Sequence, residues 1–409
     1  MDISTLARWG RNTIDVVLVG VIATGVAWRI TAISTYVADS GDEWGNTIAP
    51  FRVLLEGGDP QTFFHPSLYY YVVAAIYALW FQLLKLLSVV GDTVSMTDLF
   101  VRDIRYFVLP ARAVSAASAI LTIWAVYRLA RRMWDRRAGL VAAALLAALP
   151  LHIYYSKTVR VDAFAILMVV WAIAAIAEIP ENPTRPSYDK GGLMSGLATG
   201  ANYNGALTVC WLFLAHVGTY FGGAGSPTKH LPRALMIALI TFLITSPFIV
   251  LNFEAFSRNF GFIAGMAAQE HVGWEGRDLL FYARDLTATS SILAVLVGLG
   301  SVAMILRGSA SERLLASFPL AYFAIFSVIS SKDARFILPA MPLFLVVASG
   351  LPNFVRKRRG GGALDECASR SPPFSAHFYS RASTRCWRIL RAPPTTPSST
   401  HRTRQSWHG

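Results

Sequence analysis

The stretch DSGDEWGNTIAPFRVLLEGGDPQTFFHPSLYYY, residues 39–71, lies between two long apolar segments. Its carboxylates and its histidine are Asp39, Asp42, Glu43, Glu56, Asp59 and His65. Ionisable groups are costly to keep beside lipid, so such a cluster at the edge of an apolar segment is a functional-site hypothesis by default. We therefore expect the remaining segments to hold a membrane around these groups.

The composition excludes a soluble globular chain. Of the 409 residues, 54% are hydrophobic and 15% are charged, with a mean hydropathy of +0.45. Soluble domains carry about 25% charged residues. Several apolar runs are long enough to cross a bilayer as helices. The sequence thus predicts an all-α, polytopic transmembrane protein.

The net charge of +13 is unevenly distributed. Residues 356–409 contain eleven Lys/Arg and two acidic residues, and most other basic residues lie between apolar segments. Cytoplasmic loops of membrane proteins have this pattern, so the charge indicates topology and no nucleic-acid partner is expected. The three cysteines, Cys210, Cys367 and Cys386, have no metal-site spacing and imply no disulfide framework.

Basic residues orient the chain. Arg8 and Arg11 precede the apolar run Ile14–Ile33, which we interpret as a retained first span, so the acidic stretch should be external. The sequence RLARRMWDRRAG, residues 128–139, marks a cytoplasmic turn. If Leu68–Val90 also spanned the membrane, the basic residues at the N-terminus and the basic turn at 128–139 could not both be cytoplasmic. We therefore expect 68–90 to form a juxtamembrane or re-entrant helix on the external side.

The remaining apolar segments complete about ten spans. They are Ala111–Tyr127, Ala138–Leu151, Ala163–Ile179, Gly192–Tyr220, Ala234–Leu251, Ser291–Leu306, Leu314–Ile329 and Phe336–Leu351. The segment 192–220 is interrupted near Asn202, which favours a hairpin of two short helices over a single broken span. We expect residues 1–355 to form the transmembrane domain. Residues 356–409, rich in Ser, Thr, Pro and Arg, should form a disordered tail, with anionic-lipid binding or a reading-frame artefact as alternatives.

The predicted external loops bring cations and carboxylates to one side of the membrane. The cations Lys157, Arg160, Lys332 and Arg335 suit a phosphate, and the carboxylates suit proton abstraction or metal binding. This combination fits a lipid-phosphate substrate whose head group is held by cations while a carboxylate activates an acceptor. In glycosyl transfer with inversion, a phosphate leaving group needs no strong general acid, and positioning and charge neutralisation supply much of the catalysis.

Several motifs in order resemble one family. DEWGNTIAPFRVLLEGG and FFHPSLYYYVVAAIYALW resemble the first external loop of GT-C glycosyltransferases that use polyprenyl- or dolichyl-phosphate sugars. The protein O-mannosyltransferases and lipid A aminoarabinose transferases belong to this family. Similar segments follow in the expected order between 111 and 351, including RVDA after the basic turn, GLATGANYNGAL, TSPFIVLNFEAF and RFILPAMPLFLVVA. The resemblance covers Val16–Leu351 and implies a GT-C fold with a long first external loop carrying juxtamembrane helices.

The sequence departs from the family pattern at two places. Where the glycine-rich hairpin usually carries Thr-Lys-Tyr, this chain has Ala201-Asn202-Tyr203. We therefore expect no lysine to act at this hairpin. We also expect no counterpart of the large C-terminal soluble domain of some family members.

The resemblance assigns candidate roles to individual residues. It implies that Asp42 is the catalytic base, supported by Glu43 and Asp162 as further catalytic candidates. Its substrate-binding candidates are His65, Tyr69, Tyr70, Arg112, Lys157, Arg160 and Arg335. Structural alternatives stay open for these residues: a satisfied histidine, an interfacial aromatic belt, a helix cap at Asp162, and cations that snorkel to the interface.

The sequence thus predicts an inverting glycosyltransferase, a hexosyl or pentosyl transferase. It should move a sugar from a polyprenyl-phosphate donor to a protein, lipid or glycan acceptor. The site should face the extracytoplasmic side of the cell membrane. No metal-ligand set is assigned, although paired carboxylates also fit a divalent metal. The alternatives are a non-enzymatic lipid-carrier transporter or flippase and a catalytically inactive partner subunit.

Overall fold

The computed structural model describes residues 3–34, 41–221, 229–268, 279–289 and 291–360. Within these ranges the secondary structure is helical, as predicted. The α-helices are α1 (Ile3–Ile30), α2 (Gly41–Leu55), α3 (Leu68–Leu86), α4 (Met96–Arg102), α5 (Arg105–Met133), α6 (Arg136–Ala148), α7 (Pro150–Tyr155), α8 (Val161–Ile176), α9 (Arg185–Ala201), α10 (Leu207–Phe221), α11 (His230–Thr245), α12 (Phe248–Leu251), α13 (Phe253–Ala268), α14 (Phe281–Thr289), α15 (Ser291–Arg307), α16 (Ala310–Val328) and α17 (Met341–Gly360). Two short 3₁₀ helices are η1 (Tyr203–Ala206) and η2 (Ala334–Ile337).

Residues Met1–Asn353 form one compact unit, and a second unit begins at Phe354. The structure describes only the end of α17 in the second unit. The predicted basic tail therefore lies almost entirely outside the described residues, and the domain boundary at 355 stays a prediction.

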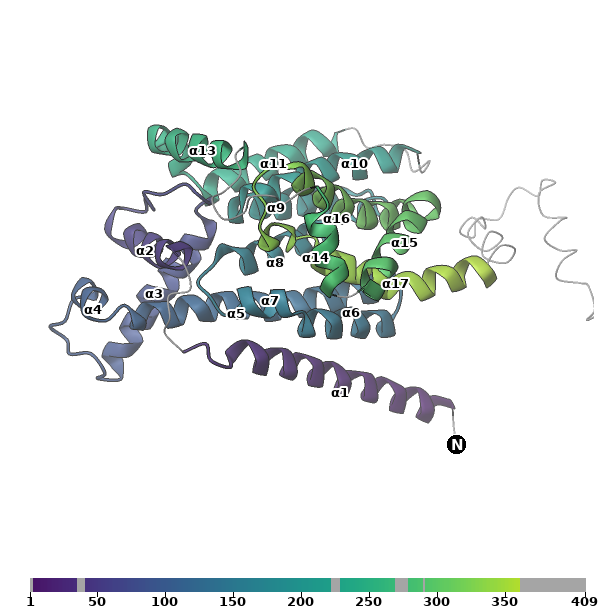
Figure 1. Ribbon diagram of the computed structural model, residues 1–409, viewed down its shortest axis with the longest axis horizontal. Coiled ribbons are helices and arrows are strands. Elements are labelled where there is room, and N and C mark those ends of the chain that lie inside the picture. The colour runs from purple at the N-terminus through teal and green to yellow at the C-terminus, as the bar shows by residue number, and fades with distance from the viewer. Residues whose placement is uncertain (1–2, 35–40, 222–228, 269–278, 290, 361–409) are drawn as a thin grey trace, which may run out of the picture. The chain divides into compact units, whose positions relative to one another are not determined.

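Helix α8 lies at the centre of the first unit. Its sequence, VDAFAILMVVWAIAAI, is apolar on every side after Asp162, and most of its residues are buried. A helix that is apolar all round is surrounded by other elements. Figure 1 shows α8 between α9 and α5, and both helices pack against it. This packing fixes the start of α8, where Arg160 and Asp162 lie.

Helices α9 and α11 approach each other along a row of glycines. Gly192, Gly196 and Gly200 are spaced four residues apart, so they lie on one face of α9. A Cβ at Gly192 would clash with the Ala234 carbonyl of α11, and one at Gly196 would lie 2.5 Å from the Ala238 carbonyl oxygen. Small residues at this spacing allow close backbone approach between membrane helices.

Replacing Gly196 by alanine should lower the melting temperature of the purified protein by several degrees. The added methyl group would meet the Ala238 carbonyl at 2.5 Å and Thr241 Cβ at 2.6 Å, so α11 has to move away. Gly298 in α15 is the matched control because a Cβ there meets nothing within 4 Å. Gly298→Ala should be neutral or stabilising by up to about 1 kcal/mol through helix propensity. Equal effects of the two substitutions on thermal unfolding would contradict this account.

The predicted hairpin at 192–220 is confirmed, although its first helix begins earlier, at Arg185. Helix α9 ends at Ala201 and α10 starts at Leu207, with η1 between them. Tyr188 near the start of α9 and His216 near the end of α10 share a hydrogen bond of 2.8 Å, so the two helices run antiparallel. Gly205 permits the turn, since a Cβ there would clash with the Ala198 carbonyl. The turn places Asn202 and Asn204 at the tip of the hairpin.

Arg29 joins α1 to the end of α6. It is fully buried, and its Nη1 donates to the carbonyl oxygens of Gly25 (3.0 Å) and Ala147 (3.2 Å). Its Nη2 donates to Leu146 O (3.3 Å) and lies 2.8 Å from Nδ1 of His152. The last carbonyls of a helix have no partner within the helix and carry a partial negative charge, so the guanidinium both satisfies and neutralises them.

Two helices, α3 and α5, are long and apolar enough to cross a membrane by length and composition. Shorter apolar helices cover Val16–Ile30, Val161–Ile176, His230–Thr245 and Ser291–Arg307. Both the number of spans and the predicted course of residues 68–90 along the membrane therefore stay predictions. Figure 1 shows α2, α3 and α4 grouped at one end of α5. That end carries the first predicted external loop.

Candidate active site

Helix α2 points two neighbouring carboxylates in different directions. Asp42 and Glu43 are in its first turn, where the helix dipole favours negative charge. Successive residues of an α-helix are about 100° apart around the axis. The Glu43 side chain is accordingly buried, 2% exposed, whereas that of Asp42 is 52% exposed. Only Asp42 is therefore accessible to a substrate.

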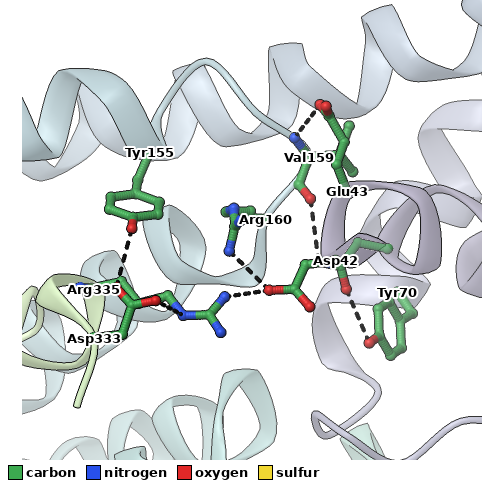
Figure 2. Close-up of polar contacts among 9 residues, drawn as sticks. Asp42, Glu43, Tyr70, Tyr155, Val159, Arg160, Asp333 and Arg335 are labelled. Atoms are coloured by element: carbon green, nitrogen blue, oxygen red, sulfur yellow. Dashed lines mark hydrogen bonds and ion pairs between the residues drawn. The ribbon is translucent and has the colours of Figure 1, made fainter. Parts of the chain in front are cut away.

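Glu43 is held on both oxygens. Arg112 of α5 donates from Nε to Oε1 (2.7 Å) and from Nη2 to Oε2 (2.9 Å). The backbone N–H of Val159 also donates to Oε1, at 2.9 Å (Figure 2). Arg112 Nη1 donates in addition to the Ile33 carbonyl at 3.0 Å. These contacts fix α2 against both α5 and the loop that precedes α8.

A second set of hydrogen bonds holds the same loop. Asn46, one turn after Asp42, donates to the Val159 carbonyl at 3.2 Å and accepts from the Tyr70 hydroxyl at 3.2 Å. Tyr69 lies 3.5 Å from the Ser115 hydroxyl, which in turn donates to the Arg160 carbonyl at 3.3 Å. Both tyrosines are buried. They position the loop and the start of α2 from behind.

Asp42 lies between two arginines that come from distant parts of the sequence. Arg160, at the start of α8, donates to Asp42 Oδ2 at 3.1 Å, and Arg335 of η2 pairs with the same oxygen (Figure 2). Asp333 orients Arg335: its Oδ1 accepts from the Arg335 backbone N–H at 3.0 Å, and its Oδ2 lies 3.4 Å from Nε. Tyr155 donates to Asp333 at 3.4 Å. Arg335 is thus positioned independently of Asp42.

The arginines set the charge of Asp42. Burial raises the pKa of the Asp42 carboxyl, but attraction to Arg335 and Arg160 outweighs it and the pKa lies below its ordinary value. Burial lowers the pKa of Arg335, and here Asp162 and Asp42 outweigh it in the other direction. Asp42 is therefore an ionised carboxylate at neutral pH, weakened as a base as long as both arginines contact it.

A cavity of about 320 Å³ opens beside this cluster. Its polar lining consists of His65, Asp162, Asn202, Tyr203, Asn204, Tyr322 and Arg335, and its apolar lining includes Phe64, Phe260, Ile263 and Phe336. Burial lowers the pKa of His65, although Asp162 opposes the shift, so the imidazole is neutral at neutral pH. A larger surface groove of about 590 Å³, lined by Trp44 and residues 100–105, contains none of the predicted site residues.

The structure brings five predicted residues together around Asp42 and the cavity: Asp42, His65, Arg160, Asp162 and Arg335. Other predicted residues are placed differently. The polar groups of Glu43 and Arg112 bind each other, Tyr69 and Tyr70 are buried behind the loop, and Lys157 does not line the cavity. Asp162 is the second residue of α8, and the N-cap position belongs to Arg160, so the helix-cap alternative is not supported.

Sequence reasoning missed several residues of the cavity and its support, namely Asn204, Tyr322, Tyr155 and Asp333. Two of them could have been found from the sequence. Asn204 follows the interruption that predicted the hairpin, and Asp333 lies in the short SSKDAR loop, which was predicted to be external. Tyr322 had none because it is one aromatic residue in an apolar helix.

The donor set does not fit a metal ion. Among the described residues, no group of three or more His, Cys, Asp and Glu side chains is arranged to hold one. The accessible carboxylate, Asp42, already has two cations on one oxygen.

The fold of this chain resembles that of solved membrane enzymes. The structure matches that of ArnT from Cupriavidus metallidurans bound to undecaprenyl phosphate, with a TM-score of 0.59 and 16% sequence identity over 85% of this chain and 63% of that one. It also matches the Archaeoglobus fulgidus oligosaccharyltransferase in the apo form, with a TM-score of 0.56 and 15% identity over 92% of this chain and 54% of that one. The chain has the GT-C fold. The resemblance predicted from the sequence is thus confirmed at the level of the fold.

A family comparison supports this GT-C assignment for part of the chain. The sequence model of the dolichyl-phosphate-mannose-protein mannosyltransferase family matches residues 106–251. The matched segment contains Arg112, Arg160, Asp162 and the hairpin. Asp42 and Arg335 lie outside this segment, and the fold brings both into contact with the site. No curated protein matches the chain significantly. The chain spans a little over half to two thirds of the length of the solved GT-C structures, 54% and 63%.

Proposed function

We propose that this protein is an inverting glycosyltransferase of the membrane that takes its sugar from a polyprenyl- or dolichyl-phosphate carrier. The observation that carries the proposal is the half-exposed Asp42 carboxylate, held by Arg160 and Arg335 beside the cavity. The solved structures with this fold include ArnT bound to undecaprenyl phosphate and the archaeal enzyme AglB with an inhibitory peptide and a dolichol-phosphate. The two arginines can bind the carrier phosphate, and the half-exposed Asp42 carboxylate can accept the acceptor proton.

The donor phosphate and Asp42 compete for the same guanidinium groups. The donor phosphate is a diester with one negative charge and two non-bridging oxygens, so like a carboxylate it can bind arginine in bidentate geometry, and the monoester that leaves carries a second charge. When Arg160 and Arg335 turn to the phosphate, Asp42 loses their attraction and its pKa rises. The carboxylate is therefore activated as a base at the moment when the donor is in place.

The transfer is a single displacement. Asp42 accepts the proton of the acceptor group, whose oxygen or nitrogen lone pair forms a bond to the anomeric carbon of the sugar. The bond from that carbon to the phosphate oxygen breaks, and the electron pair leaves with the phosphate. Arg160 and Arg335 neutralise the charge that develops on the leaving phosphate. The configuration at the anomeric carbon is inverted.

The surrounding groups are assigned supporting roles. Glu43 and Arg112 are positioning residues, because both are buried and their polar groups bind each other. His65 and Asp162 face the cavity and contact the sugar or the acceptor. The loops that carry these groups lie on the extracytoplasmic side of the plasma membrane. The acceptor is a protein, lipid or glycan, and the sugar is a hexose or pentose.

The test is radiolabelled transfer in liposomes that contain the purified full-length protein. The donors are dolichyl-phosphate [³H]mannose and an undecaprenyl-phosphate pentose, each offered with a Ser/Thr-containing peptide, lipid A or a glycan. The proposal predicts carrier-dependent transfer with inversion. Movement of labelled lipid between leaflets without transfer would instead establish the flippase alternative, for which neither the matched family nor the archaeal structure gives support.

A further inference from the structure

The hydroxyl of Tyr322 is buried without a well-aligned hydrogen-bond partner. Tyr322 is on α16, is 1% exposed, and its hydroxyl has no well-aligned hydrogen-bond partner among the described residues, with the Asn204 side chain as its nearest polar neighbour. Its ring is fixed by Phe318, at a centroid distance of 5.8 Å, and by Phe326, stacked at 4.6 Å. Buried polar groups are nearly always satisfied, and an exception in a folded protein requires an explanation.

The cavity supplies the explanation. Two other described tyrosines, Tyr71 and Tyr127, also have buried hydroxyls without a partner, but only Tyr322 of the three lines the 320 Å³ cavity. The packing of the protein leaves the Tyr322 hydroxyl without a well-aligned partner. Because this hydroxyl lines the cavity, a ligand bound there can form a hydrogen bond with it. Its orientation is fixed before any ligand arrives, because the aromatic contacts hold the ring.

Asn204 presents a second neutral polar group at the same end of the cavity. Its backbone N–H binds the Asn202 side chain at 3.1 Å, which fixes the hairpin tip. The Asn204 side chain lines the cavity and lies close enough to the Tyr322 hydroxyl to interact with it directly, so one ligand group can contact both. An amide and a phenol together provide donors and an acceptor without net charge.

The charges around the cavity determine which ligand group fits this end. Asp162 lies within Coulombic range of Tyr322 and also lines the cavity. A carboxylate there repels a phosphate but accepts a hydrogen bond from a hydroxyl. Of the cations that suit a phosphate, Arg160 contacts Asp42 and does not line the cavity, whereas Arg335 contacts Asp42 and also lines the cavity.

We propose that Tyr322 and Asn204 form a subsite that recognises an uncharged hydroxyl group of the transferred sugar and so determine donor selectivity. This rests on the function proposed above and deepens it, because it assigns the carrier phosphate to the two arginines and a sugar hydroxyl to Tyr322 and Asn204. The subsite favours a neutral hydroxylated sugar over one that presents a charged group at this end.

The test compares two ligands on two tyrosine variants of the full-length protein. The variants are Tyr322→Phe and the matched control Tyr127→Phe, which removes a buried, unpartnered hydroxyl that does not line the cavity. The ligands are dolichyl-phosphate mannose and dolichyl phosphate alone, measured by ligand-induced thermal shift and, for the first, by transfer. Tyr322→Phe should weaken binding of the sugar-bearing lipid by about 10-fold, the value of one hydrogen bond, and leave the affinity for dolichyl phosphate unchanged. Tyr127→Phe should change neither.

Deoxy sugars identify the hydroxyl that is recognised. The analogues are donors with a 3-, 4- or 6-deoxy sugar. One of them should bind the wild-type protein about 10-fold more weakly than the full donor does. The substitution Tyr322→Phe should not weaken the binding of that analogue further. Asn204→Ala should reproduce part of this pattern. Equal weakening of both lipids would show that Tyr322 binds phosphate and would overturn the proposal, as would an unchanged affinity for the sugar-bearing lipid. Because binding is measured separately, a protein that binds the donor selectively but transfers nothing refutes the proposed function and not the subsite.

Discussion

The variant Asp42→Asn should lose transferase activity by a factor of about 10² to 10⁴, the usual contribution of a positioned general base. Asparagine keeps the shape of the side chain but cannot accept the acceptor proton. The fold should survive, since the Asp42 side chain is 52% exposed and the asparagine side-chain oxygen can still accept hydrogen bonds from Arg160 and Arg335. Activity and melting temperature are therefore measured on the same preparation.

Glu254→Gln is the control for this substitution. Glu254 is in α13, its side chain is 83% exposed, and it forms an ion pair with Arg258 one turn later in the same helix. Its removal should leave transfer unchanged. If Asp42→Asn transfers sugar at the wild-type rate with a normal melting temperature, Asp42 is not the base.

The pH dependence should differ between the free protein and the donor complex. In the free protein the pKa of Asp42 lies below its ordinary value because of the arginines, so the carboxylate stays ionised down to low pH. Donor binding removes that attraction and raises the pKa. The acid limb of kcat should therefore lie at higher pH than the acid limb of kcat/KM. Coincident limbs would show that the arginines remain on Asp42 during the reaction.

The second large effect is expected on stability, from Arg112→Met. This change leaves the buried Glu43 carboxylate without its guanidinium partner, while the Val159 N–H still donates to its Oε1. Removing one partner of a buried ion pair costs about 3–5 kcal/mol. Transfer should also fall, because α2 and the loop that carries Arg160 lose their common anchor.

A double variant separates the charge from the packing. Glu43→Gln combined with Arg112→Met removes both charges and should recover most of the thermal stability, since a buried pair is often replaceable by neutral groups of similar volume. Thermal unfolding of the wild type, the single variant and the double variant makes the comparison. A double variant no more stable than Arg112→Met would show that the lost stability came from packing or from the Ile33 contact.

The sequence predicted those parts of the fold and site that depend on composition and local motifs. Apolar runs predicted the all-α architecture, and the interruption at Asn202 predicted the hairpin. The DE and HP motifs, together with the cations of the external loops, predicted Asp42, His65, Arg160 and Arg335. The sequence alone does not reveal which neighbouring carboxylate faces the protein interior. That depends on α5 supplying Arg112 to Glu43, a contact between residues 69 positions apart.

The same limit explains the misplaced aromatic residues. Tyr69 and Tyr70 have the composition of an interfacial belt, yet both are buried against groups brought by α2 and α5. Tyr322 belongs to the cavity only because α16 packs near the hairpin tip. Contacts of this kind arise from tertiary packing, and no spacing within the chain encodes them.

The buried Arg29 has a consequence for biogenesis. Its partners, the carbonyls of Leu146 and Ala147 and the ring of His152, are synthesised well over a hundred residues after it. Until they emerge, Arg29 near the end of the first apolar segment has no acceptor beyond its own helix, and it can avoid the lipid only by snorkelling to the interface. We therefore expect α1 to enter the lipid late, or to wait at the membrane surface or beside the insertion machinery until α6 is complete. A nascent chain that ends before residue 146 should be extracted from membranes more readily than one that ends after residue 152.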